Sequence, residues 1–145
     1  MTDLEYRQHM AEMERYEWYI YRGGNRPIYL MLPEYHAERI KNGRAKKYQY
    51  SVELCSDHFG FVPDYQKDLN ALVRVAEKLC DKLGEGWEWT IAFCYASFQH
   101  ITEDDVDEVL VQISGDTTQE ALWQACCKAI DYLEKQSRTK QECRK

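Results

Sequence analysis

The sequence contains no apolar run that approaches the roughly 18 residues a membrane-spanning helix needs. A secretory signal is missing as well, because the first five residues already include the acidic Asp3 and Glu5 where a signal peptide would be basic or apolar. These two absences disfavour membrane proteins and secreted proteins. We therefore expect a cytosolic protein with no membrane partner.

A disulfide framework is also missing, although the chain has six cysteines. Cys80, Cys126 and Cys127 fall inside segments with helical periodicity, and the other three cysteines show no framework spacing. Reduced thiols in a cytosolic protein are the simpler account of this pattern.

Motifs that would identify an enzyme are absent: there is no nucleophile elbow, no phosphate loop and no paired-carboxylate motif. Cys55 and His58 have zinc-like spacing, and Cys94 with His100 could complete four ligands, but a second closely spaced pair is lacking. We expect no cofactor, no metal and no catalytic residue. One alternative is kept open, a small nucleotide hydrolase or metal-dependent enzyme using His58 or His100 beside a cysteine or a carboxylate.

Positive charge is in short supply, since 19 basic residues face 25 acidic ones and the net charge is −6. A duplex-binding protein needs many cationic contacts to release counterions, so duplex nucleic acid is not an expected partner. The charge is also unevenly spread. The run Glu103–Glu108 holds five acids, whereas the stretch Arg39–Lys47 holds five basic residues that could bind one anionic ligand.

The chain does have the length of one domain, 145 residues, of which 44% are hydrophobic. Such a chain buries roughly two thirds of the surface that it exposes when unfolded. We expect a single α+β domain over residues 1–135, with a small antiparallel sheet flanked by helices in an α/β/α sandwich. Residues 136–145 have no large apolar side chain and are expected to form a flexible basic tail.

Hydrophobic periodicity and turn residues predict the elements of the N-terminal half. Two extended runs separated by Gly23-Gly24-Asn25 form either a hairpin or a strand followed by an ordered loop. The alternation of Tyr48, Tyr50, Val52 and Leu54 with polar residues predicts a strand with one buried face. In order, we expect a helix over 4–16, extended runs over 17–22 and 27–32, a helix from Pro33 to Asn42-Gly43, and a strand over 47–54.

The C-terminal half has the clearest pattern. Apolar residues recur at three- and four-residue steps from Leu69 to Leu83, which predicts an amphipathic helix that opens near Pro63. A strand with a large aromatic face is expected from Trp87 to Tyr95. An acidic loop over 96–108, a second strand over 109–113 and a final helix that begins at a Thr117–Glu120 capping box and runs to about Lys135 complete the half.

This half resembles the phage ABA sandwich domain family from about Pro63 to Lys135. The similarity is carried by the Pro63–Ala71 helix start with its Pro-x-Tyr-x-x-Asp pattern, the Lys82–Trp87 segment, the Gly115-Asp116-Thr117 turn, and the small-residue helix Ala121–Ala129. The resemblance implies a helix–strand–strand–helix module and a phage or prophage accessory protein located in the host bacterial cytosol. It implies no catalytic residues.

Several side chains could contact a ligand or partner besides their structural role. Asp116 and Thr117 lie at an expected helix start, where free N–H groups gather, although capping is the first interpretation. Tyr65 and Asp68 stand at the other helix start. The candidate binding residues are Arg39, Arg44, Lys46, Lys47, Tyr65, Asp68, Trp87, Trp89, Glu103, Asp104, Asp105, Asp107, Asp116 and Thr117.

We expect a noncatalytic accessory protein that acts by binding. In the leading hypothesis it is a counter-defence protein, an inhibitor that docks on a host defence protein through acidic and aromatic surface. In the alternative it is a sponge that sequesters a small (cyclic) nucleotide immune signal in a pocket of aromatic and basic side chains, as a homo-oligomer.

Overall fold

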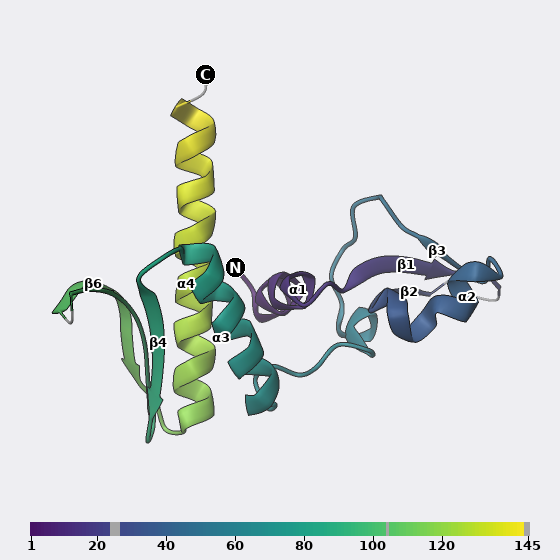
Figure 1. Ribbon diagram of the computed structural model, residues 1–145. Helices are drawn as coiled ribbons and strands as arrows, with labels where there is room; N and C mark the ends of the chain where they lie inside the picture. The colour runs from purple at the N-terminus through teal and green to yellow at the C-terminus, as the bar shows by residue number, and fades with distance from the viewer. Residues whose placement is uncertain (24–26, 104, 144–145) are drawn as a thin grey trace. The chain divides into compact units, whose positions relative to one another are not determined.

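The computed structural model describes residues 1–23, 27–103 and 105–143 (Figure 1). Over these residues the chain has four α-helices and two three-stranded antiparallel sheets, which confirms the predicted α+β class. It divides into two compact units, which we call the N-terminal unit (residues 1–64) and the C-terminal unit (residues 65–145). No helix in the described part of the chain is long and apolar enough to cross a membrane.

The N-terminal unit begins with helix α1 (Asp3–Met13), whose start is fixed by a reciprocal capping box between Thr2 and Glu5. Its sheet has the order β2-β1-β3, with β1 (Glu17–Tyr21) between β2 (Ile28–Met31) and β3 (Ala45–Lys47). β1 pairs antiparallel with β2, as the hairpin interpretation expects. The predicted turn at Gly24-Asn25 lies outside the described residues.

Short helices connect the strands of this unit. A 3₁₀ helix, η1 (Pro33–His36), leads directly into α2 (Ala37–Lys41), whose C-cap is Asn42 as predicted. One face of the sheet buries Tyr19, Met31 and Ala45, with Ile40 of α2 packed against them. A second 3₁₀ helix, η2 (Ser56–Phe59), lies beside β2.

The predicted strand over 47–54 is wrong, because β3 ends at Lys47. Lys47 pairs with Tyr19, and the N–H of Tyr48 still donates to the Trp18 carbonyl at 3.0 Å. β1 begins only one residue before Trp18, so almost none of it is left to pair with the chain beyond Tyr48. Tyr50, predicted to lie on the buried side, is 77% exposed.

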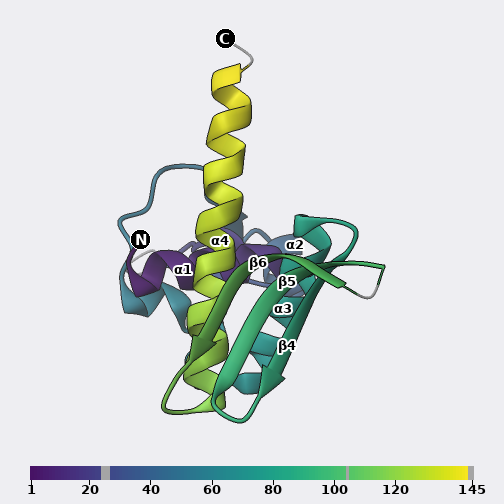
Figure 2. The ribbon, with the colours of Figure 1, turned by 90° about the vertical axis from the view of Figure 1, so that its left-hand side faces the viewer.

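The C-terminal unit is a meander of three strands with a helix at each end. Its elements are α3 (Leu69–Leu83), β4 (Trp87–Ala92), β5 (Tyr95–Thr102), β6 (Asp105–Ser114) and α4 (Thr118–Cys143), and the sheet order is β4-β5-β6. Both helices lie on the same face of the sheet, as Figures 1 and 2 show from two sides. This unit therefore has two layers by itself, one fewer than an α/β/α sandwich.

Two predictions for this unit are wrong. The acidic segment over 96–108 is not a loop, and the segment from Trp87 to Tyr95 is not one strand, because it contains β4, a turn and the first residue of β5. β4 stops at Ala92, and Cys94 adopts a left-handed conformation (φ 56°) that turns the chain into β5. Phe93, at this turn, is 93% exposed. The acidic residues therefore fall at the second turn and along the start of β6, so the unit has three strands where the resemblance implied two.

The core of the C-terminal unit lies between the sheet and the helices. Phe98 on the central strand pairs with Trp89 of β4 and is fully buried, as are Leu72 and Leu79 of α3 and Leu122 of α4. The three leucines follow the periodic stripes of the sequence, whereas Phe98 falls in the segment that was predicted to be a loop. Burial of this apolar surface is the main stabilising contribution to the fold.

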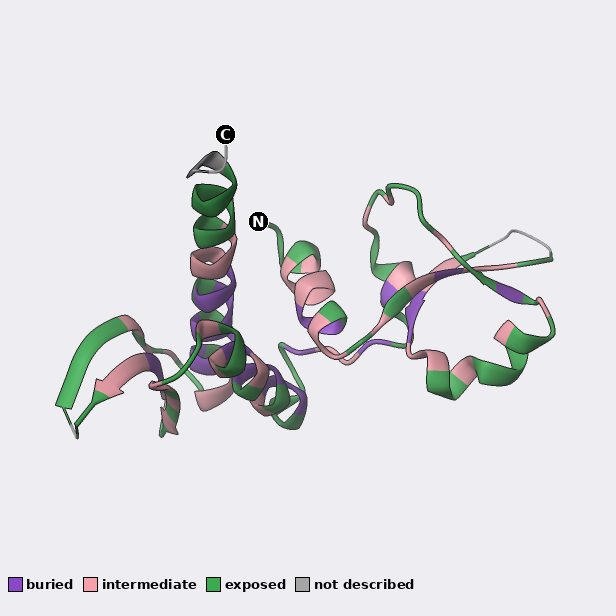
Figure 3. Ribbon diagram, turned by 45° about the horizontal axis from the view of Figure 1, so that its top comes forward, coloured by how far each residue is buried: buried purple, intermediate pink, exposed green. Residues whose placement is uncertain are grey.

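Helix α4 continues to Cys143, past the predicted end at Lys135. Figure 3 shows its buried residues confined to the part beside the sheet, whereas residues 135–141 are exposed. Strong helix formers such as Gln136, Lys140 and Gln141 keep the segment helical without burial. The predicted basic tail is thus an exposed helical extension over its described residues.

Candidate binding sites

A surface pocket of about 450 Å³ lies at one end of the sheet in the N-terminal unit. We call it the β3 pocket. It contains two of the four predicted basic residues, Lys46 and Lys47, which β3 places beside β1. Its lining residues are Ile20, Tyr21, Arg22, Gly23, Lys46, Lys47, Tyr48 and Tyr50.

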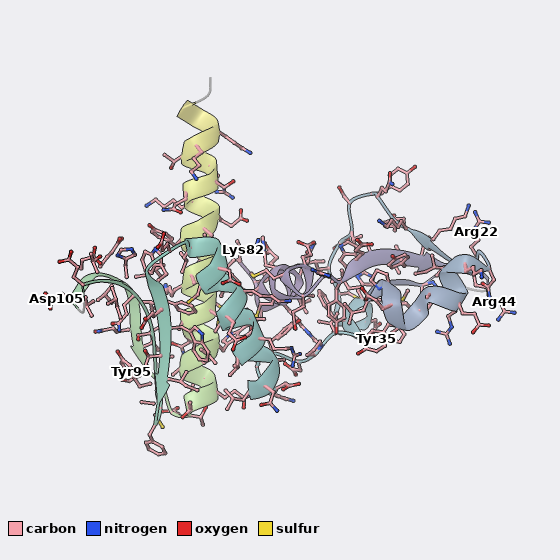
Figure 4. The ribbon with its side chains drawn as sticks, in the orientation of Figure 1. Arg22, Tyr35, Arg44, Lys82, Tyr95 and Asp105 are labelled. Carbon is pink, nitrogen blue, oxygen red and sulfur yellow. The ribbon has the colours of Figure 1, made fainter. Side chains whose placement is uncertain are left out.

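The other two predicted basic residues do not line this pocket. The Arg39 Nη1 group donates to the Tyr21 hydroxyl at 3.0 Å, and that hydroxyl is 3.2 Å from His36 Nδ1. Burial, and secondarily Arg39, lowers the pKa of His36, so its neutral ring can accept the Tyr21 proton. The backbone carbonyl of Arg44 accepts the N–H of Arg22 at 2.7 Å. Figure 4 shows the side chains of Arg22 and Arg44 at the same end of the sheet.

The cations of the β3 pocket differ in how far they are neutralised. Lys47 Nζ lies 3.3 Å from Glu17 Oε2, which also accepts the Tyr19 hydroxyl at 3.1 Å. Burial, together with the hydrogen bond to Glu17, raises the pKa of Tyr19 to about 12. Among the described residues no carboxylate pairs with Arg22 or Lys46. These two side chains therefore carry uncompensated positive charge at the pocket.

A second concave surface, of about 340 Å³, lies in the C-terminal unit. We call it the tryptophan groove. It is lined by residues of α3 and β4, namely Glu77, Cys80, Asp81, Trp87, Glu88 and Trp89. The predicted Trp87 and Trp89 thus line an opening of the surface, while Phe98, the neighbour of Trp89 on β5, is part of the core.

One wall of the tryptophan groove is held in place by ring contacts. Trp87 meets His100 edge-on, with the ring centroids 5.5 Å apart, and Tyr132 of α4 at 6.2 Å. Burial, and then the charges of Asp81 and Glu88, raises the pKa of Cys80 to about 11. The thiol is therefore neutral at physiological pH and lies in a negative field.

The predicted acidic residues lie on the β5–β6 hairpin, except Asp104, which is outside the described residues. Glu103 occupies the turn with φ 49°, and Asp105 opens β6. Figure 4 shows Asp105 at the hairpin end remote from α4. Asp107 has a structural role, because its carboxylate binds His100 at 2.6 Å and Thr102 at 3.2 Å.

The remaining predicted residues have structural contacts. Tyr65 is fully buried. Asp68 caps α3 by accepting the N–H of Ala71 at 3.1 Å. Thr117 accepts the N–H of Glu120 at 3.0 Å, as the predicted capping box requires, whereas the Glu120 carboxylate accepts the N–H of Asp116, one residue before the N-cap, at 3.3 Å.

The cysteine and histidine side chains weighed as ligands or catalytic groups are not gathered into one site within either unit. Cys94 and His100 lie toward opposite ends of β5, with the Cys94 thiol donating to the Asp116 carbonyl at 3.4 Å. Cys55 and His58 belong to the N-terminal unit, where the His58 ring meets Trp18 edge-on at 5.7 Å. Among the described residues no group of three metal-ligating side chains comes together.

Sequence reasoning missed the residues that complete both surfaces. The sequence pattern predicts a strand through Tyr48 and Tyr50, and it gives no role to Glu77 and Asp81. The four-residue spacing of Glu77 and Asp81 does place them on one helix face. What they face depends on how β4 packs against α3.

No family model matches the chain, and no curated protein or solved structure matches it either. The resemblance to the phage ABA sandwich family therefore stays a prediction.

Proposed function

We propose that the protein acts without catalysis, by docking the acidic and aromatic surface of its C-terminal unit onto a basic segment of a partner protein. The observation that carries this proposal is the tryptophan groove. Three acidic residues, Glu77, Asp81 and Glu88, line it together with two tryptophans, and none of their carboxylates pairs with a cation among the described residues.

This combination suits a lysine or arginine side chain. Tryptophan is the best aromatic partner for a cation, and the attraction grows when the cation is partly removed from water. The carboxylates supply charge-assisted hydrogen bonds to the same group, and a guanidinium can satisfy two oxygens at once. An unpaired cluster of negative charge beside aromatic rings therefore favours a basic partner over a neutral or acidic one.

The net charge of the C-terminal unit as a whole also favours a basic partner. Residues 65–145 contain fifteen acidic and ten basic residues, against ten and nine in residues 1–64. The β5–β6 hairpin adds Glu103 and Asp105 at an exposed end of this unit. Such a field accelerates the encounter with a basic surface and is weakened by salt.

The candidate partner remains a host defence protein, which would make the chain a counter-defence inhibitor. Recognition of a basic segment can be tested before that partner is known. The probes are a nonapeptide of arginine and a nonapeptide of glutamate, each labelled with a fluorophore and titrated with the protein while anisotropy is measured. Binding of the arginine peptide alone, weakening with added salt, is the expected result.

Charge reversal separates the groove from the overall charge. The double variant E77K/D81K should weaken arginine-peptide binding about tenfold or more, because each reversed charge repels the probe. The matched control E38K/E53K makes the same change of net charge on exposed positions of the N-terminal unit. Equal weakening by both variants would show that peptide binding depends only on the net charge of the protein, and the proposal would be dropped.

A further inference from the structure

The β3 pocket combines features that the proposed docking function does not use. It lies in the N-terminal unit, and its charge is opposite to that of the tryptophan groove. Its volume of about 450 Å³ falls within the range of roughly 300–1,000 Å³ that is usual for small-ligand sites. It therefore needs its own explanation.

The aromatic part of the pocket is a pair of tyrosines that lacks the burial expected of core residues. The rings of Tyr48 and Tyr50 meet edge to face, with centroids 5.5 Å apart, and Tyr50 is 77% exposed. Ile20 pairs directly with Lys46, so their side chains project from the same face of the sheet. An apolar residue and two phenol rings thus offer a stacking surface for a planar group.

The cationic part lies beside this surface. Arg22 and Lys46 are exposed and have no carboxylate partner among the described residues, whereas Lys47 pairs with Glu17 on the other face of the sheet. A guanidinium binds phosphate through two parallel hydrogen bonds, while an ammonium acts as a compact point charge. Free cations gathered at one pocket, in a chain of net charge −6, favour an anion.

We propose that the β3 pocket binds a nucleotide, with the phosphate held by Arg22 and Lys46 and the base stacked on Tyr48 and Tyr50. A simple anion would leave the tyrosines unused, and an uncharged ring would leave two cations unpaired. A phosphate joined to a planar base satisfies both. A free mononucleotide and the unpaired end of a nucleic acid present this same chemistry.

The binding test uses AMP, adenosine and inorganic phosphate as probes, each titrated into the full chain by isothermal calorimetry. AMP should bind more tightly than either of its parts, because only AMP reaches both halves of the pocket. A 5′-phosphorylated single-stranded oligonucleotide of adenine forms the fourth arm. Tighter binding of the oligonucleotide than of AMP identifies a nucleic acid end as the source, and the reverse order identifies a free nucleotide.

Two variants test the two halves separately. K46Q should weaken AMP binding about tenfold, the effect of losing one charge-assisted hydrogen bond, and Y50L should weaken it several-fold through lost stacking. Both side chains are exposed, so the variants should keep the circular dichroism spectrum and melting temperature of the parent protein. K41Q, in the same basic stretch but outside the pocket lining, should bind AMP as the parent does.

The proposal is overturned if AMP binds no more tightly than inorganic phosphate, or if K46Q and Y50L bind AMP as well as K41Q does. These outcomes are independent of the arginine-peptide experiment, because the two sites share no residue. If the variants of one site lose binding at that site and keep binding at the other, the two functions are distinct.

Discussion

His100 Nδ1 lies 2.6 Å from Asp107 Oδ1, while the Nε2 atom of the same ring lies 3.1 Å from the Glu85 carbonyl oxygen. Both partners accept hydrogen bonds, so both ring nitrogens donate and the imidazole is charged in this arrangement. The hydrogen bond to Asp107 is the main reason that the pKa of His100 is raised above its ordinary value of 6.5. Hydrogen bonding to His100 in turn lowers the pKa of Asp107 below 3.8.

This pair gives the stability of the protein a predictable pH dependence. Because the pKa of His100 is raised on folding, its contribution is complete below about pH 6.5 and is lost as the pH rises through the folded-state value. The Asp107 contribution is present above about pH 3.8 and is lost as the pH falls through the lowered value. The pair should therefore stabilise most between these limits.

The measurement is a urea denaturation series across pH for the parent protein and H100Q, with the His100 ring titrated by NMR. H100Q should remove the fall in stability that accompanies deprotonation of His100. His9, which is also a histidine of the chain but lies on α1, supplies the matched variant H9Q. A His100 titration midpoint at or below 6.5 would contradict the assigned charge state.

Gly86 is required where the chain enters β4. Its φ is +87°, and a Cβ at this position would lie 2.5 Å from His100 Nε2, whose ring is held by its hydrogen bonds and by Trp87. G86A should therefore destabilise the protein by about 2–4 kcal/mol, the sum of left-handed strain and a steric clash. Chemical denaturation measures the loss.

Gly84 separates these two effects. Its φ is +112°, but a Cβ there would meet nothing within 4 Å, so G84A adds strain without the clash. We expect G84A to cost about 1–2 kcal/mol, less than G86A. The double variant G86A/H100A should recover part of the difference, since alanine leaves room for the new methyl group. Equal losses in G84A and G86A would show that the ring moves aside freely.

A side-chain hydrogen bond at Thr117 caps the start of α4. Thr117 Oγ1 accepts the N–H of Glu120 at 3.0 Å. T117A should lower the free energy of unfolding by about 1 kcal/mol, the usual cost of losing an N-cap, whereas T117S should keep most of it. Thermal unfolding followed by circular dichroism is the measurement.

A control within the same helix is Thr139. Its hydroxyl donates to the Lys135 carbonyl at 3.0 Å, but it lies in the exposed extension of α4. T139A should leave stability unchanged or raise it slightly, because alanine has the higher helix propensity. A loss at T139A as large as that at T117A would mean that the cap has no special role.

The helices could be predicted because their information is local. The stripe that includes Leu72 and Leu79 repeats every three or four residues, and the Thr117–Glu120 box marks a helix start without reference to the rest of the chain. The β4–β5 turn could not be found this way. It is made by Phe93 and Cys94, and a cysteine at φ 56° carries none of the glycine, asparagine or proline signals of a tight turn.

The two sites depend on packing that no local pattern contains. Period-two alternation through Tyr48 and Tyr50 is typical of a strand, and it fails because β1 offers no partner beyond Trp18. The same failure exposes the tyrosines that line the β3 pocket. Glu77 and Asp81 likewise become part of a groove only because Trp87 and Trp89 stand opposite α3.

The free thiols should react in an order set by burial. Cys126 is fully buried, and burial raises its pKa well above the ordinary value, so the reactive thiolate is scarce and inaccessible in the folded protein. Cys80, half-buried with a pKa of about 11, should react slowly. Cys55 is exposed and should be labelled before both of them. Iodoacetamide labelling at pH 8, followed by peptide mass spectrometry over time, checks this order.

The labelling experiment also reports on the tryptophan groove, because the Asp81 and Glu88 charges raise the pKa of Cys80. In E88Q the Cys80 thiol should react faster than in the parent protein, since one negative charge beside the thiolate is removed. Labelling of Cys126 should stay as slow as before, which would show that the fold has not opened. An unchanged Cys80 rate in E88Q would mean that Glu88 adds no negative field at this thiol, and the docking of a basic segment would then have to rest on Glu77 and Asp81 alone.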